Sequence, residues 1–226
     1  MARTPRSFLL EQLRAQADAV AAKRVQQLKL SREVVDRVDK CMHAIFQYFD
    51  EATRLLQTIA PPIERAFELP HLVRFEGLHL EKASVMFRKQ RVLDHEAYDY
   101  VVVYYTLAGP PLPPLRVPIR RSPEIERMLA SAHIEFTTDT DSSVDTGATH
   151  NVIRLKPDLR CEVRFDPDFE NGHIVVTLRN VDRFEPVILD FETVALDTRA
   201  LDDLANLMLA RPSQFLLRAP LRGFNR

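Results

Sequence analysis

The sequence predicts an α+β protein in which long N-terminal helices form a coiled-coil or helical-bundle arm and an antiparallel β-barrel with a C-terminal helix follows. Two observations predict this fold class. Residues 6–60 contain no proline and no glycine, and their apolar residues recur at helical spacing. From about residue 70 onward, short runs rich in β-branched and aromatic residues alternate apolar with polar positions, which is typical of strands. We therefore divide the chain into a helical arm (1–62), a barrel domain (63–210) and a basic, apolar tail (211–226).

The helical arm begins at Thr4-Pro5, where a hydroxyl can cap the helix and proline suits the first helical position. It ends before Pro61-Pro62. Ser31 could cap a second helix and make the arm a hairpin, or one helix could run through, and the sequence leaves both open. The second half of the arm carries an a/d heptad seam, whose residues follow one another at alternating steps of three and four: Val35, Val38, Met42, Ile45, Phe49, Ala52, Leu56 and Ile59.

This heptad seam predicts a contact between copies of the chain. Residues 31–59 would form a rod of ~43 Å at 1.5 Å per residue, and a β-domain of this size is hardly longer. A second apolar line widens the buried face and favours a multi-helix bundle: Val34, Cys41, Tyr48 and Leu55. The alternative is that the helix covers the chain's own β-domain, as amphipathic helices usually do.

The barrel domain is expected to contain a short helix over 122–132, opened by Ser122-Pro123, and a polar surface loop at 139–150. A second helix at about 198–210 follows Asp197. The late turns are short and no helix separates the late strands, so the sheet should be antiparallel and closed as a barrel. Alternation places the strands at 73–80, 84–89, 98–107, 133–138, 159–165, 173–181 and 187–193.

The net charge and the composition of the chain restrict its possible functions. The formal net charge is -1, so no global field attracts the chain to a nucleic-acid polymer or an anionic membrane. No run approaches the ~20 apolar residues that span a bilayer. The two cysteines, Cys41 and Cys161, fall on apolar stripes, which predicts buried reduced thiols and a cytoplasmic location. No two of the five glycines are close together, which argues against a phosphate-binding glycine loop.

The last elements are similar to the second half of a PilZ domain, over about residues 150–210. The segment 172–176 (Gly-His-Ile-Val-Val) resembles the penultimate strand of that family, and 187–201 resembles its closing strand and helix. A long heptad helix beside such a domain also resembles the atypical tetrameric branch of the family, which assembles through helical arms. The resemblance implies a six-stranded barrel, a homotetramer, and a non-catalytic regulatory adaptor that acts on a protein partner.

PilZ domains typically bind cyclic di-GMP through an RxxxR segment and a [DN]xSxxG segment, because arginines meet phosphates and stack on guanine. The RxxxR spacing occurs at 116–120, and also at 160–164 and 179–183. The nearest match to the second segment, 141–147, is one residue longer. We expect a divergent adaptor with no cofactor. The alternative is a genuine cyclic di-GMP receptor, whose ligand-binding residues would be Arg116, Arg120, Arg121, Asp141, Ser143 and Gly147.

Other chemistry has weaker signals. The seven histidines show no compact ligand spacing for zinc. The segment 139–145 copies the first ligand positions of a calcium loop, but Val144 replaces the turn glycine and His150 the bidentate glutamate. No nucleophile motif is visible, so the protein is not expected to be an enzyme, and a small hydrolase is the second alternative. The tail 211–226 could dock on an acidic partner or pack back on the barrel.

Overall fold

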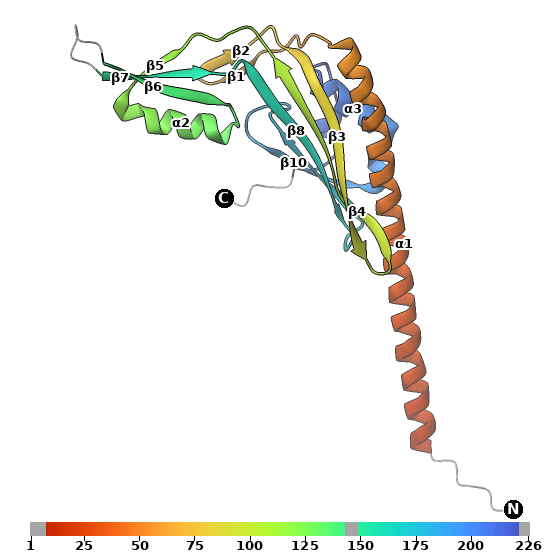
Figure 1. Ribbon diagram of the computed structural model, residues 1–226. Helices are drawn as coiled ribbons and strands as arrows, with labels where there is room; N and C mark the ends of the chain where they lie inside the picture. Colours follow the sequence, from red (N-terminus) through yellow and green to blue (C-terminus); the bar gives the residue numbers. More distant parts are fainter. Residues whose placement is uncertain (1–7, 143–148, 222–226) are drawn as a thin grey trace, which may run out of the picture.

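The computed structural model describes residues 8–142 and 149–221, and in the long first helix it describes side chains from Ser31 onward. Helices and strands succeed one another in an α+β order (Figure 1). In chain order they are α1 (Phe8–Ile59), β1 (Phe67–Leu69), β2 (Val73–Phe75), β3 (His79–Val92), β4 (His95–Ala108), β5 (Leu115–Pro118), η1 (Ile119–Arg121), α2 (Ser122–Ser131), β6 (Phe136–Ser142), β7 (Thr149–Leu155), β8 (Asp158–Asp168), β9 (His173–Arg179), β10 (Val187–Glu192), η2 (Thr193–Ala195), α3 (Thr198–Met208) and η3 (Phe215–Leu217).

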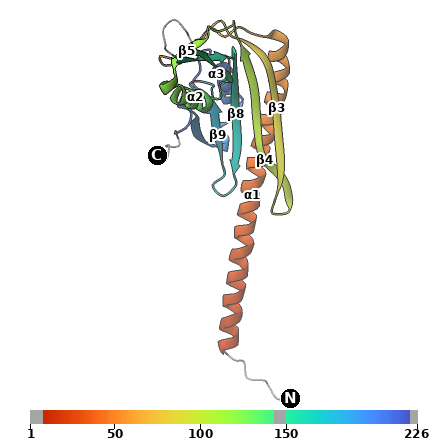
Figure 2. The same ribbon diagram turned by 60° about the vertical axis from the view of Figure 1, so that its left-hand side comes forward.

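The first helix, α1, is a single helix of 52 residues. Ser31 lies inside it, so the helix runs through and the hairpin alternative is wrong. The absence of proline and glycine allows this length. The helix ends at Ile59, and the next residue, Ala60, has a left-handed φ of 44° directly before Pro61. The N-terminal half of α1 projects well beyond the sheet, and the C-terminal half lies along it (Figures 1 and 2).

Five antiparallel strands form the main sheet in the order β10-β9-β8-β4-β3. Its strands bury alternate residues, as in β8, where Leu159, Cys161, Val163 and Phe165 all face the core. Two smaller sheets, β1-β2 and β5-β7-β6, stand apart from it. None of the three sheets closes on itself, so the predicted barrel is wrong. Apolar alternation fixes which face is buried, but it is the same in an open sheet covered by helices as in a barrel.

The heptad seam of α1 is buried against the chain's own sheet. Phe49 packs on Phe165 of β8, with ring centroids 5.9 Å apart. Ala52 and Leu56 also pack against this core, whereas Ile59 is 67% exposed. The prediction that the whole seam forms the contact between copies is therefore wrong, because its central side chains are already covered within one chain. The fully covered residues are Val35, Val38, Met42, Ile45 and Phe49.

Strand length explains this correction. β3 and β4 have 14 residues each, which extends them to roughly 48 Å at 3.4 Å per residue. They are therefore as long as the helical rod that covers them. The β8–β9 turn also fits closely against α1. Gly172 in that turn has φ +73°, and a Cβ atom there would lie 2.9 Å from Arg37 Nη2 and 3.2 Å from a Val34 methyl carbon.

The C-terminal helix α3 covers the rest of the same face of the main sheet. Leu201, Leu204 and Met208 are buried, and the Tyr48 hydroxyl of α1 donates to Asp202 at 2.7 Å. The tail then packs back on its parent domain, as one of the two alternatives for it predicted. Phe215 is fully buried, with its ring centroid 5.0 Å from that of Phe191, and Asp190 N–H donates to Pro220 at 3.3 Å.

A small α/β unit stands at one end of the main sheet (Figure 1). It consists of the β5-β7-β6 sheet and α2, which covers one of its faces through Ile125 and Leu129. The predicted loop at 139–150 is largely a hairpin, since β6 continues to Ser142 and β7 begins at Thr149. Positions 143–148 lie outside the described residues. Among the described residues, no helix is long and apolar enough to cross a membrane.

Candidate functional site

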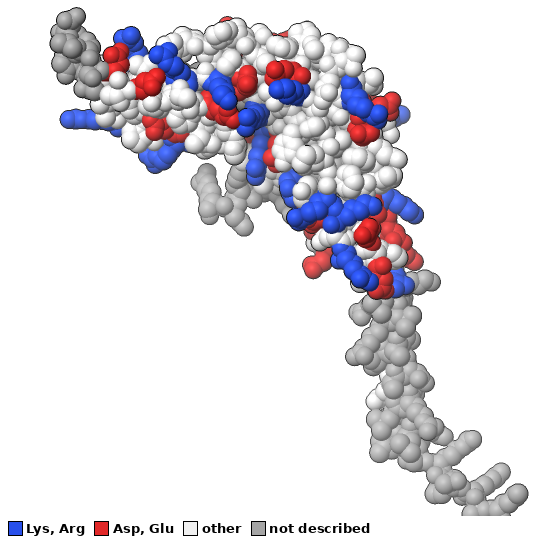
Figure 3. All heavy atoms as spheres, in the orientation of Figure 1, with Lys and Arg blue, Asp and Glu red and all other residues white. Residues whose placement is uncertain are grey.

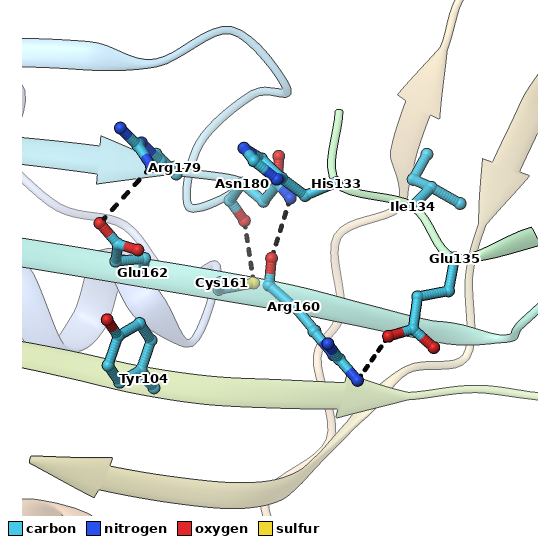
Figure 4. Close-up of a pocket in the computed structure, with 9 residues that line it drawn as sticks. All are labelled: Tyr104, His133, Ile134, Glu135, Arg160, Cys161, Glu162, Arg179 and Asn180. Carbon is cyan, nitrogen blue, oxygen red and sulfur yellow. Dashed lines mark hydrogen bonds and ion pairs between the residues drawn. The ribbon is translucent and has the colours of Figure 1, made fainter. Parts of the chain in front are cut away.

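A cleft lies between the small α/β unit and the outer face of the main sheet (Figure 4). The outer face is the one opposite the buried residues that α1 covers, such as Phe165 of β8. The volume of the cleft is about 460 Å³. One wall is the segment 133–135, which links α2 to β6, and the other is formed by β4, β8 and the end of β9. The polar and aromatic side chains that line this cleft are Tyr104, His133, Glu135, Arg160, Glu162, Arg179 and Asn180.

Strand register places three of these side chains in one row. Tyr104 of β4 lies opposite Glu162 of β8, which lies opposite Arg179 of β9. All three point to the outer face, because the residues that alternate with them, such as Tyr105 and Leu178, are buried in the core. Arg179 Nη1 and Glu162 Oε1 are 3.9 Å apart, which makes a loose ion pair. The row therefore presents a phenol ring, a carboxylate and a guanidinium side by side.

Asn180 holds the wall formed by residues 133–135 against the main sheet. This side chain is 1% exposed, and its Nδ2 donates to the Ala132 carbonyl after α2 and to the Arg160 carbonyl of β8, both at 2.8 Å. One amide thus ties the small α/β unit to the main sheet. Asn180 and His133 both adopt left-handed backbone, with φ 55° and 54°. Asparagine tolerates this conformation better than most residues.

Charges in the cleft are balanced between cations and anions. Arg160 Nη2 lies 2.5 Å from Glu135 Oε1, and Lys156 also pairs with Glu135. The hydrogen bond from Lys156, together with the charge of Arg160, lowers the pKa of Glu135, so this carboxylate stays ionised at neutral pH. Basic and acidic side chains are likewise interspersed over the face of the molecule that Figure 3 shows. The cleft offers a mixture of charges rather than a field of one sign.

The thiol beside the cleft is a poor nucleophile. Cys161 is 2% exposed, and its Sγ donates to the Asn180 carbonyl at 3.0 Å. Burial raises the pKa of this thiol far above its ordinary value, so it remains protonated and unreactive. Both cysteines are free in the structure, and Cys41 is half-buried.

Four of the residues that the sequence predicts for cyclic di-GMP binding are among the described residues, and they lie in or beside the small α/β unit. Arg116 of β5 and Asp141 of β6 approach to 4.0 Å on an exposed face. Arg120 borders a shallow groove along α2 that Arg116 does not line. Arg121 is exposed in η1, and the remaining two predicted residues, Ser143 and Gly147, lie outside the described residues.

Sequence reasoning missed the cleft. The charged, outward positions of β8 were visible as an alternation, and Arg160 and Arg179 each begin an RxxxR spacing. Arg160 and Arg179 line one cleft with residues 133–135 because of the position of the small α/β unit on the main sheet. No local sequence pattern predicts that position. As for metals, no three His, Cys, Asp or Glu side chains among the described residues gather closely enough to hold an ion.

Comparisons of the chain with protein-family models, curated proteins and solved structures found no match. The resemblance to PilZ domains therefore stays a prediction. The order of β8, β9, β10 and α3 is the order of elements on which that resemblance rests.

Proposed function

We propose that this protein is a non-catalytic regulatory adaptor whose cleft binds a small ligand carrying an anionic group and a planar ring. The observation that carries the proposal is that two arginines, Arg160 and Arg179, line the same cavity as the ring of Tyr104, one near each end of it (Figure 4). Guanidinium groups bind carboxylates and phosphates in a planar, bidentate way, and a phenol ring offers a stacking surface.

Arg179 is the residue best placed to take the anionic group. Its side chain is 46% exposed, and its ion pair with Glu162 spans 3.9 Å. An anion entering the cleft could therefore form shorter hydrogen bonds to Arg179 than Glu162 does. Arg160 is held more firmly, because Glu135 already pairs with it at 2.5 Å. We assign Arg160 the role of shaping the wall and Arg179 the role of binding the anion.

The non-catalytic part of the proposal rests on the protonation states around the cleft. The Cys161 thiol has a raised pKa and is engaged by a backbone carbonyl, so it does not supply a thiolate. The lowered pKa of Glu135 keeps that carboxylate ionised, so it does not supply a proton at neutral pH. These two states argue against a cysteine nucleophile and against Glu135 as a general acid, and that is the support for a non-catalytic role.

Self-association also belongs to the proposal, but at a different place from the heptad seam. The seam is occupied by the chain's own sheet, while the N-terminal half of α1 projects beyond it (Figures 1 and 2). We assign the contact between copies to this projecting half, residues 8–30. Such an arm would leave the cleft, at the other end of the molecule, open to ligand.

The test is calorimetric titration with cyclic di-GMP and with GMP, which both carry a planar base and an anionic phosphate. We expect binding that Arg179→Ala weakens by about tenfold or more, because a charge-assisted hydrogen bond contributes about 1.5–3 kcal/mol. Arg183→Ala is the matched control, since Arg183 follows the same strand, is half-exposed and does not line the cleft.

Two results would contradict the proposal. One is the absence of heat from both nucleotides at millimolar concentration. The other is binding that survives Arg179→Ala but is lost in Arg116→Ala. That pattern would move the site to the small α/β unit, where the sequence predicted it.

A further inference from the structure

The main sheet has two edges, and the chain covers them unequally. At the β10 edge, Leu189 forms a bridge with Leu221 of the tail, and Asp190 N–H donates to Pro220. β3 forms the other edge, and β4 is the one strand among the described residues that pairs with it. An edge strand exposes a row of backbone donors and acceptors that another extended chain can use. The β3 edge is therefore the place to look for a partner.

Only the first part of β3 is covered by its own chain. Pro62 forms a bridge with His79, Leu80 N–H donates to Pro61 at 3.1 Å, and the Gln57 side-chain amide donates to the Ala83 carbonyl. Beyond Ala83, no backbone hydrogen bond within the described residues reaches this edge. We define residues 84–92 as the free edge, which is about 30 Å long at 3.4 Å per residue.

The direction of the free backbone groups follows from Ala83. Its carbonyl accepts from Gln57 in α1, so it points away from β4. The N–H and C=O of one residue in an antiparallel strand point to the same side, and the side alternates along the strand. The register with β4 is regular from Lys82 to Arg88. Val85 and Phe87 therefore direct their backbone groups outward.

The side chains beside the free edge combine apolar and basic character. Met86 is 51% exposed and Phe87 is 45% exposed, although Phe87 also contacts Phe46 of α1, with ring centroids 4.7 Å apart. From Lys82 to Val92 the strand has no acidic residue and has the cations Lys82, Arg88, Lys89 and Arg91. Arg88 pairs with Asp99 of β4, and Lys89 lies over the Tyr98 ring. Of the three cations at the end of the strand, Arg91 is therefore the most available to pair with an acid of a partner.

This charge pattern decides between the possible occupants. In an antiparallel pairing of two copies of the free edge, cations would lie opposite or near cations, and like charges across strands are destabilising. A strand with acidic side chains on the face of Lys89 and Arg91 and apolar side chains on the other face would instead complement both these cations and the exposed Met86.

We propose that the free edge of β3 accepts an extended acidic segment of a partner protein by β-strand addition. The segment would hydrogen-bond to the outward backbone groups of Val85 and Phe87, and its acids would lie near Lys89 and Arg91. This mode of recognition takes affinity from main-chain hydrogen bonds and specificity from alternate side chains. It uses a surface separate from the cleft, so the two proposals can fail independently.

The test uses a fluorescent peptide of about nine residues that alternates glutamate and valine, the length of the free edge. Anisotropy should show binding to the full chain, and about tenfold weaker binding to Val85→Pro, which removes one outward N–H. Val85→Thr is the matched control, because it keeps the N–H and the branched shape, and it should bind like the native protein. Thermal unfolding by circular dichroism checks that Val85→Pro is folded.

A second pair of measurements tests the charge. The combined Lys89→Glu and Arg91→Glu variant should lose the acidic peptide, while a peptide with lysine in place of glutamate should not bind the native chain. Binding of both peptides alike, or equal affinity in Val85→Pro and Val85→Thr, would overturn the proposal. So would a concentration-dependent dimer that Val85→Pro abolishes, because the free edge would then hold a second copy.

Discussion

At the scale of single residues, the cleft depends most on Asn180. Its amide is buried and bonds to two backbone carbonyls, one in the small α/β unit and one in the main sheet. Its backbone is left-handed, so two properties of asparagine are used at once. A residue that lacks either property would change the relative position of the two walls.

Substitutions at Asn180 can separate these properties. Asn180→Gly removes the amide but permits the left-handed backbone, and we expect the free energy of unfolding to fall by about 1–3 kcal/mol, because two carbonyls lose their donors. Asn180→Ala should cost about a further 1 kcal/mol for the backbone. Urea denaturation measures both. Losses within about 0.5 kcal/mol of zero, the range typical of surface substitutions, would show that the amide does not hold the walls together.

The sequence alone predicted much of which elements have a buried face. The strand at 159–165 and the helix at about 198–210 were predicted, because burial on one face leaves a period of 2.0 or 3.6 in the sequence. The role of Asn180 was not predicted. A lone asparagine at the end of a strand gives no periodic signal, and its partners, Ala132 and Arg160, are distant in sequence.

At the scale of elements, α1 has two halves with different roles. Val35 is the first of its described residues to be buried, and the fully buried part of the seam ends at Phe49. The heptad pattern correctly predicted which face of α1 is buried, but the partner of that face is the chain's own sheet and not a second copy. A stripe of apolar residues at a and d positions fits a flat apolar sheet face as well as it fits another helix. The pattern alone does not distinguish the two.

Removal of residues 1–30 tests this division. We expect the midpoint of thermal unfolding to change by less than about 3 °C, because a domain of this size shifts by about 2–4 °C per kcal/mol and the core of α1 begins after Ser31. Phe49→Ala in the full chain is the contrast, and it should cost about 3–5 kcal/mol through the cavity it leaves.

Light scattering on the same truncated chain addresses self-association. The molar mass should fall to that of one chain, while the full chain should be larger. A truncated protein that unfolds many degrees lower would show that residues 1–30 belong to the folded core. An unchanged oligomer would place the contact between copies elsewhere.

At the scale of the whole molecule, one face of the main sheet is covered by α1 and α3, and the other face contributes to the cleft. The sequence predicted the α+β class and most strands, because these follow from local periodicity. It did not predict that three sheets remain separate, since closure depends on strand length, twist and the place of each helix. The candidate cleft lies where two of these separate parts meet, and that is why local patterns did not reveal it.

The central claim is that the heptad seam is buried within one chain, which leaves the outer face and the free edge open to partners. The most direct measurement is a nuclear Overhauser experiment on an equal mixture of ¹³C-labelled and unlabelled chains. We expect a contact between the rings of Phe49 and Phe165 within labelled chains, where their centroids are 5.9 Å apart. We expect none between labelled and unlabelled chains. A Phe49 contact that appears only between the two kinds of chain would contradict the account.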